Sequence, residues 1–217
     1  MPFAAIQTRY TPEAYLALER KADYKSEYVN GQIFAMAVAN RRHNLIASNF
    51  CREVSLQLRG RPCETYISDM RVKVSNTGLY TYPDVVVACG DFRFEDMNND
   101  TLINPIVIVE VLSPSTEAYD RGEKFAHYRR LASLQEYLLV SQNQVRIEHY
   151  VRQGTQWALS EASALDEGVH LAAIHCDIAL QEVYDKVSFA LSDEAVAKGI
   201  APTGEGPVSH SDPQSVN

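Results

Sequence analysis

The amino-acid sequence predicts a mixed α/β fold, in which helices flank a central mixed β-sheet. Two short β-branched runs, YPDVVVACG and PIVIVEVLSP, are typical of strands inside a sheet. Segments with helical periodicity precede and follow these runs. A length of 217 residues with 46% hydrophobic residues describes one ordinary soluble domain. We expect this domain to cover residues 1–195, followed by a disordered tail over residues 196–217 that is rich in Gly, Pro and Ser.

The N-terminal region is predicted to begin with a helix and a β-hairpin. Thr11 fits an N-cap, and Pro12 fits the first helical position of a short helix that ends near Leu18. Asn30-Gly31 lies between SEYV and QIFAMA and supplies the two positive-φ positions of a type I′ turn. A helix and a hairpin therefore precede the main sheet.

The central segments are predicted to be one further helix and a series of strands. A helix over about residues 40–59 places Ile46, Phe50 and Val54 on one apolar face. CETYISDMRVKV, residues 63–74, alternates well enough for one long strand, and residues 91–104 form a polar loop between the two β-branched runs.

The C-terminal third is predicted to contain a helix, three antiparallel strands and a closing helix. Helical periodicity returns in Phe125, Tyr128 and Leu131. EYLLVS, QVRIEHYV and TQWALSE are typical of successive strands, and HLAAIHCDIALQEVYDKV fits a final strand or loop with a helix.

Composition restricts the classes of function. A formal net charge of -8 argues against a protein that coats nucleic acid nonspecifically, although a local basic groove is compatible with it. The N-terminus lacks the pattern of a signal peptide, and no apolar run reaches the roughly 20 residues of a membrane span. The four cysteines lack metal-binding spacing, so we expect free thiols in a reducing cytoplasm: Cys51, Cys63, Cys89 and Cys176.

Two carboxylates stand in apolar strands. Glu110 lies near the end of PIVIVEVLSP on the same face as Ile108 and Leu112, and Asp84 lies at the start of VVVA. An ionised carboxylate in an apolar sheet must find a partner, become neutral or bind a cation. If the two strands are neighbours, the acids meet at one end of the sheet, where Mg2+ or Mn2+ suits their oxygen ligands.

A lysine follows these acids along the chain. Lys124 lies near the start of a helix that is expected to begin around Asp120, where the helix dipole disfavours a cation. The position of Lys124 therefore suggests that this lysine has a role other than stabilising the helix. Asp120 and Glu123 fit an N-cap and its third-position partner, so we interpret both as structural.

These residues carry a resemblance to a known family. YPDVVV, IVEVLSPSTEAYDRGEKFAHYRRL, QEYLLV and SEYVNGQIFAMA resemble the Uma-two type of putative restriction endonuclease within the PD-(D/E)xK nuclease superfamily, over roughly residues 10 to 190. The resemblance implies a restriction-endonuclease-like central mixed sheet flanked by helices.

The resemblance also implies roles for particular residues. Asp84 and Glu110 correspond to the metal ligands, and Glu27 to a further acid near the metal. The usual lysine position, two residues after the acid, holds Leu112, so Lys124 from the following helix is the candidate for the catalytic cation. His43 is a less firm catalytic candidate that faces inward on its helix.

The resemblance implies a Mg2+- or Mn2+-dependent endonuclease that hydrolyses phosphodiester bonds of DNA. Five arginines are candidates for phosphate contacts: Arg41, Arg42, Arg121, Arg129 and Arg130. Cleavage of both strands would suit a two-fold homodimer. The alternative is a noncatalytic nucleic-acid-binding or assembly module that retains the fold, and a hydrolase built on Ser113 is a distant third.

Overall fold

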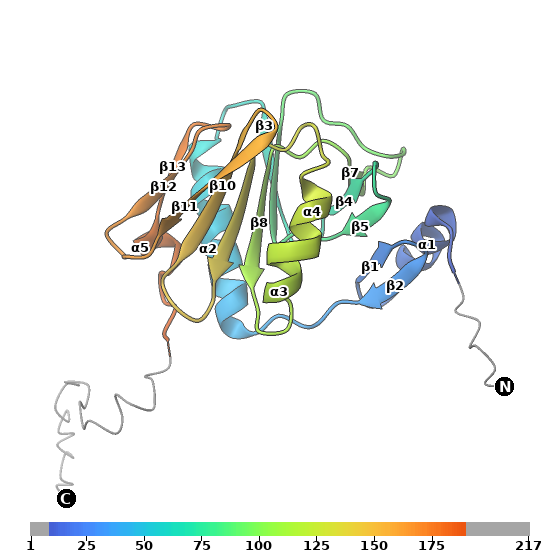
Figure 1. Ribbon diagram of the computed structural model, residues 1–217, viewed down its shortest axis with the longest axis horizontal. Helices are drawn as coiled ribbons and strands as arrows, with labels where there is room; N and C mark the ends of the chain where they lie inside the picture. The colour runs from blue at the N-terminus through green and yellow to red at the C-terminus, as the bar shows by residue number, and fades with distance from the viewer. Residues whose placement is uncertain (1–8, 190–217) are drawn as a thin grey trace, which may run out of the picture. The chain divides into compact units, whose positions relative to one another are not determined.

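The structure is a computed structural model that describes residues 9–189. The described residues up to Val187 form one compact unit. The predicted tail over residues 196–217 lies outside the described residues. Two larger sheets and a two-stranded one make up the unit, with helices against them (Figure 1).

The N-terminal helix and hairpin form as predicted. Helix α1 (Pro12–Glu19) begins at Thr11, whose hydroxyl accepts a hydrogen bond from the Ala14 N–H. The hairpin of β1 (Ser26–Val29) and β2 (Gln32–Ala35) turns at Asn30 and Gly31, whose φ angles are 52° and 85°. The positive-φ pair therefore sets the register of the first two strands.

The hairpin belongs to a five-stranded sheet. Its strand order is β2-β1-β5-β4-β7, and only the β4–β7 pair is parallel. The further strands are β4 (Arg71–Val74), β5 (Leu79–Thr81) and β7 (Thr101–Leu102). Strand β7 lies within the segment that was predicted to be a polar loop.

The second sheet is the central mixed sheet predicted from the sequence. Its order is β11-β10-β9-β8-β6-β3, and its one parallel pair is β8–β9. The strands are β3 (Cys63–Ile67), β6 (Val85–Cys89), β8 (Val107–Leu112), β9 (Glu136–Ser141), β10 (Ile147–Gln153) and β11 (Gln156–Ala162). A parallel pair needs a crossover connection, and the helical segment between β8 and β9 provides it.

Helices cover both faces of the central sheet. Helix α2 (Arg41–Gln57) packs against β3, β6 and β8 on one face, as Figure 1 shows behind the strands. The crossover lies on the other face and consists of α3 (Glu117–Tyr119), the π-helical turn η1 (Asp120–Lys124) and α4 (Phe125–Tyr128). The chain closes with β12 (Gly168–Leu171), β13 (Cys176–Ala179) and α5 (Leu180–Val183).

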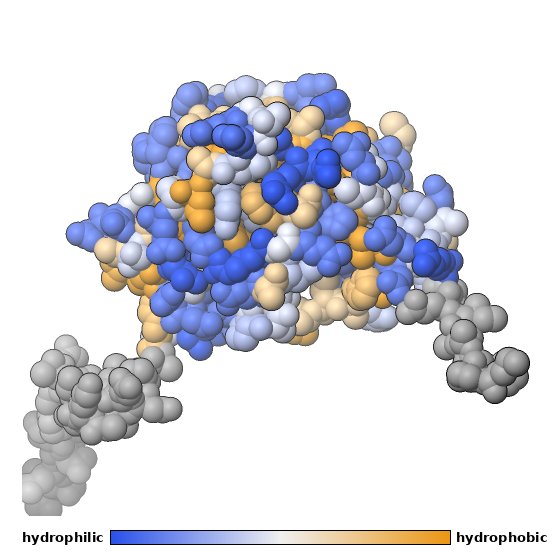
Figure 2. Space-filling model, in the orientation of Figure 1, coloured by the Kyte–Doolittle hydropathy of each residue, from blue (hydrophilic) through white to orange (hydrophobic). Residues whose placement is uncertain are grey.

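The hydrophobic core joins the two larger sheets and the crossover. Val72 and Leu79 of the five-stranded sheet lie in one buried cluster with Ile108 and Leu139 of the central sheet and Tyr128 of α4. On the face of the molecule in Figure 2, hydrophilic side chains predominate and hydrophobic ones lie in small groups among them. The main apolar surface is therefore buried between the layers.

One predicted strand is divided in two. Residues 63–74 form β3 in the central sheet and β4 in the five-stranded sheet, so the prediction of a single long strand is wrong. The break lies at Ser68, which has a φ of 55° and whose N–H donates to the Asp84 carbonyl oxygen. A left-handed residue ends the extended conformation, and the chain passes from one sheet to the other.

The expectation of four free thiols is also wrong. Cys63 and Cys89 are directly opposite in the β3–β6 pair and form a disulfide across 26 residues of sequence, whereas Cys51 and Cys176 are free. The cysteine pattern therefore gives no support for a reducing compartment. None of the helices within residues 9–189 is long and apolar enough to cross a membrane.

Candidate functional site

The register of β6 and β8 brings the two strand carboxylates together. Val85 is paired with Val109 in this antiparallel pair, so Asp84 and Glu110 are the next opposed positions. The Asp84 Oδ2 atom accepts a hydrogen bond of 2.7 Å from the Val111 N–H. The predicted meeting of the two acids at one end of the sheet is confirmed.

Glu110 is held by two groups of the crossover. The Tyr128 hydroxyl donates to Glu110 Oε1 at 2.8 Å, and Lys124 Nζ lies 3.0 Å from the same oxygen. Glu110 is only 4% exposed, and Lys124 is 5% exposed. The candidate lysine thus reaches the acid from the following helical segment, while Leu112 is buried in the core.

Lys124 also contacts acids from two other elements. Its Nζ atom lies 3.1 Å from Glu27 Oε1 and 3.5 Å from Asp120 Oδ1. Glu27 comes from β1 and also accepts a hydrogen bond from the Thr81 hydroxyl. The N-terminal hairpin therefore supplies one wall of the site.

His43 contacts the cluster from the opposite face of the sheet. It lies in the first turn of α2, and its Nε2 atom is 3.2 Å from Asp84 Oδ2. Its Nδ1 atom is buried and has no hydrogen-bond partner within the described residues. The structure thus brings together all five predicted site residues: Glu27, Asp84, Glu110, Lys124 and His43.

The predicted N-cap position of Asp120 is wrong. The helical segment begins at Glu117, so Asp120 is inside it, 3% exposed and directed at Lys124 instead of capping the helix. Asp120, Lys124 and Tyr128 are four residues apart and share one face, the spacing that could have identified Asp120 and Tyr128 as site residues. Residues 120–124 form a π-helical turn, a deviation that is frequent at functional sites.

Burial and charge compete at the cluster. Burial raises the pKa of Glu110 to about 8. The positive charge of Lys124 lowers this pKa only in part, and the negative charges of Asp120 and Asp84 raise it further. Burial likewise raises the pKa of Asp120. Burial alone would lower the pKa of Lys124, yet its acidic neighbours, with Glu110 first, raise it well above the usual value. The lysine therefore keeps its proton.

The oxygen atoms of the acidic cluster are of the chemical type that binds a hard divalent cation. Glu27, Asp84, Glu110 and Asp120 offer carboxylate oxygens, which Mg2+ and Mn2+ prefer. Within residues 9–189, no group of three or more His, Cys, Asp or Glu side chains is arranged to hold a metal ion. The ammonium group of Lys124 lies where three of the acids converge. These three carboxyl groups share the ammonium group of Lys124, so a divalent cation would add positive charge where the acids outnumber it.

The cluster lies in a cleft with a volume of about 840 Å³. The start of α2 and the loop after β8 contribute to the walls, through Asn40, His43 and the segment Ser113–Thr116. Of the five arginines predicted to contact phosphate, Arg121 is engaged in ion pairs with Glu117 and Glu148.

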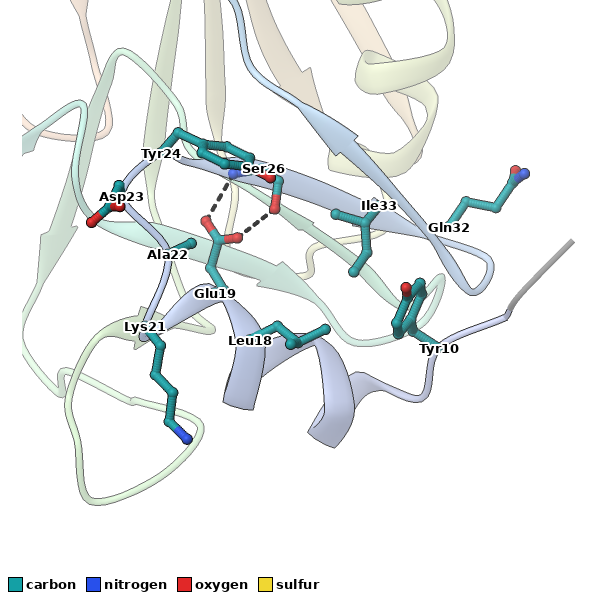
Figure 3. A pocket seen from close by; sticks show the side chains of 10 residues that line it. All are labelled: Tyr10, Leu18, Glu19, Lys21, Ala22, Asp23, Tyr24, Ser26, Gln32 and Ile33. Carbon is teal, nitrogen blue, oxygen red and sulfur yellow. Dashed lines mark hydrogen bonds between the residues drawn. The ribbon is translucent and has the colours of Figure 1, made fainter.

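A second hollow, with a volume of about 660 Å³, lies between α1 and the hairpin (Figure 3). Its buried acid, Glu19, accepts hydrogen bonds from the N–H and hydroxyl of Ser26 and from the Tyr82 hydroxyl. These partners satisfy the carboxylate and tie the helix to the sheet. We therefore interpret Glu19 as structural.

Comparisons with known proteins agree with this fold. The family model Uma2, described as "Putative restriction endonuclease", matches residues 12–181. The uncharacterized protein sll1609 of Synechocystis sp. (strain PCC 6803) is 40% identical over 152 residues, which cover 70% of this chain and 86% of that protein. The uncharacterized protein slr1290 of the same strain is 37% identical over 182 residues, which cover 83% and 94%.

A solved structure has the same architecture. The crystal structure of a putative nuclease belonging to DUF820 from Anabaena variabilis ATCC 29413 aligns with a TM-score of 0.69 and 18% identity. The alignment covers 82% of this chain and 99% of that one. The predicted fold class, a mixed α/β fold with a central mixed sheet flanked by helices, is confirmed.

Proposed function

The chain belongs to the Uma2 family, and from this membership we propose that it is a metal-dependent endonuclease that hydrolyses phosphodiester bonds of DNA. One observation carries the proposal. Asp84 and Glu110 are opposed across two strands, and Lys124 reaches them from the crossover within a single cleft. A set of two acids and a lysine at one end of a mixed sheet is the set expected from the family resemblance.

The acids of the cluster would hold the metal. Asp84, Glu110 and Glu27 are the proposed ligands of Mg2+ or Mn2+, which when bound polarises a phosphoryl oxygen and acidifies a water molecule. Tyr128 and His43 orient Glu110 and Asp84 through the contacts described above. The Thr81 hydroxyl does the same for Glu27, so each proposed ligand is held by a second side chain, as is usual around metal sites.

Lys124 would act as an electrostatic group. Its acidic neighbours keep it protonated, so it cannot serve as a general base near neutral pH. Its N–H groups would donate to the phosphoryl oxygens that gain negative charge as the attacking water adds. The lysine thus lowers the barrier by stabilising charge, while its position on η1 is set by packing of the crossover on the sheet.

The nucleic acid is proposed to be DNA, and the active form a homodimer, because one copy per strand would cut both strands of a duplex. Light scattering during size-exclusion chromatography tests the dimer. A monomer at the concentration used for cleavage would remove this part of the proposal.

Cleavage assays test the activity. Circular plasmid and single-stranded DNA are incubated with the protein in Mg2+ or Mn2+, and with EDTA as a control. The variants are Asp84→Asn, Glu110→Gln and Lys124→Met, and Glu161→Gln on the exposed part of β11 is the matched control. Cleavage that EDTA abolishes, and that only the control variant retains, supports the proposal. Cleavage by all variants indicates a contaminating enzyme, and no cleavage at all favours the noncatalytic module.

A further inference from the structure

The start of helix α2 contacts a buried glutamine that follows strand β9. The Asn40 Oδ1 atom caps α2 by accepting the His43 N–H at 3.0 Å. The Asn40 Nδ2 atom donates to Gln142 Oε1 at 2.7 Å. Because the cap commits the Asn40 oxygen, its nitrogen must face Gln142, and Gln142 must present its oxygen in return. The orientation of the Gln142 amide is therefore fixed.

The remaining donor of Gln142 has no acceptor. Gln142 is 1% exposed, and its Nε2 atom is buried without a hydrogen-bond partner in the described part of the chain. A buried donor without a partner is costly, and such groups are few in native structures. Gln142 lines the same cleft as the acidic cluster. A ligand oxygen in the cleft would supply the missing acceptor.

The surroundings of this donor favour an anion. Helix α2 has 17 residues, and the N–H groups of its first turn, at Arg41 and Arg42, have no acceptor within the helix. The helix dipole places partial positive charge at the same end. The Arg42 side chain lies beside Gln142, with Nη1 3.4 Å from the Gln142 carbonyl oxygen. Hydroxyls of Ser113 and Thr116 line the same cleft.

The geometry points to a second phosphate subsite: we propose that the start of α2 and the Gln142 amide bind a backbone phosphate of the nucleic acid adjacent to the scissile one. The inference rests on the proposed function for the identity of the ligand. His43, in the first turn of α2, contacts Asp84, so the subsite directly adjoins the acidic cluster. A neutral amide and backbone N–H groups would fix the register of the strand, since phosphate contacts position the substrate without reading its sequence.

Nuclear magnetic resonance of the full, metal-free chain tests the subsite directly. The probes are a thymidine dinucleotide, which carries one phosphodiester, and inorganic phosphate. The Gln142 side-chain amide is assigned from the signal that disappears in Gln142→Glu. We expect saturable shifts of this amide and of the Arg41 and Arg42 backbone N–H groups with the dinucleotide. Shifts with inorganic phosphate alone would assign a free-anion site and overturn the nucleic-acid ligand, and unshifted signals with both probes would overturn the subsite.

Binding of a fluorescein-labelled oligonucleotide in EDTA provides the second measurement. Gln142→Glu keeps an oxygen for Asn40 and replaces the free donor with an acceptor, so we expect affinity to fall about tenfold or more. Gln153→Glu changes the net charge equally at an exposed position of β10 and should bind like the wild type. Equal affinities of the two variants would contradict the subsite. If the NMR signals shift but the protein cleaves no DNA, only the proposed nuclease activity is contradicted. If the protein cleaves DNA but the signals do not shift, only the phosphate subsite is contradicted.

Discussion

The Nζ atom of Lys124 lies 3.0 Å from Oε1 of Glu110, and the two side chains are 6% and 5% exposed. The pKa of Glu110 is nevertheless raised, because burial outweighs the attraction of the lysine. Buried ion pairs often stabilise a fold less than apolar side chains of similar size would. The proposed role of the two residues in metal binding and catalysis gives a reason for burying such a pair.

Removal of the lysine should destabilise the fold. Lys124→Met leaves Glu27, Glu110 and Asp120 without their shared cation, so we expect a loss of about 3–5 kcal/mol in the free energy of unfolding. Urea denaturation in EDTA measures it. Lys21→Met, at an exposed position, should change stability by less than about 0.5 kcal/mol. Mn2+ should restore part of the stability that Lys124→Met loses. Equal stability of Lys124→Met and Lys21→Met would contradict the role of Lys124 as the shared cation of the three acids.

Glu110 should make stability depend on pH. Its pKa is about 8 in the folded protein against a usual 4.5, so the folded state holds the proton more tightly. The resulting stabilisation is complete below the unfolded pKa and is lost as the pH rises toward 8. In EDTA, the wild type should lose stability between about pH 5 and pH 8, on the order of a few kcal/mol, and Glu110→Gln should lose much less. Thermal unfolding across this range measures it, and parallel curves for the two proteins would refute the shift.

The disulfide should contribute measurably to stability. Cys63 and Cys89 close a loop across 26 residues of sequence, which in the chain-entropy model stabilises the fold by about 3.5 kcal/mol. Dithiothreitol should lower the unfolding midpoint of the wild type. The double variant Cys63→Ser/Cys89→Ser should unfold at the lower midpoint with or without reductant. A wild-type midpoint that does not respond to reductant would show that the bond is absent in solution.

Local signals account for the parts of the fold that the sequence predicts well. Thr11 and Asn30-Gly31 act within a few residues of themselves, so the first helix and the hairpin are evident in advance. The division of residues 63–74 is not evident, because alternation continues on both sides of Ser68 and no glycine marks its positive φ. The disulfide depends on the pairing of β3 with β6, which no spacing in the sequence reveals.

The candidate site also has residues that the sequence predicts and residues that only the structure identifies. Asp84 and Glu110 stand out because carboxylates in apolar strands need a partner, and their meeting depended on the adjacency of β6 and β8. Asp120 fits a cap in sequence and takes another role only because the helix begins at Glu117. Gln142 is a single neutral residue after a strand, and only the hydrogen bond from Asn40 shows that its other amide atom lacks a partner.

Calorimetric titration of the metal-free protein with Mn2+ tests most directly whether the acids around Lys124 bind a divalent cation. We predict one site per chain in the wild type and in Glu161→Gln, with affinity reduced about tenfold or more in Asp84→Asn, because a carboxylate ligand is lost. Equal affinity in Asp84→Asn, or an absence of binding by the wild type, would contradict metal binding by these acids.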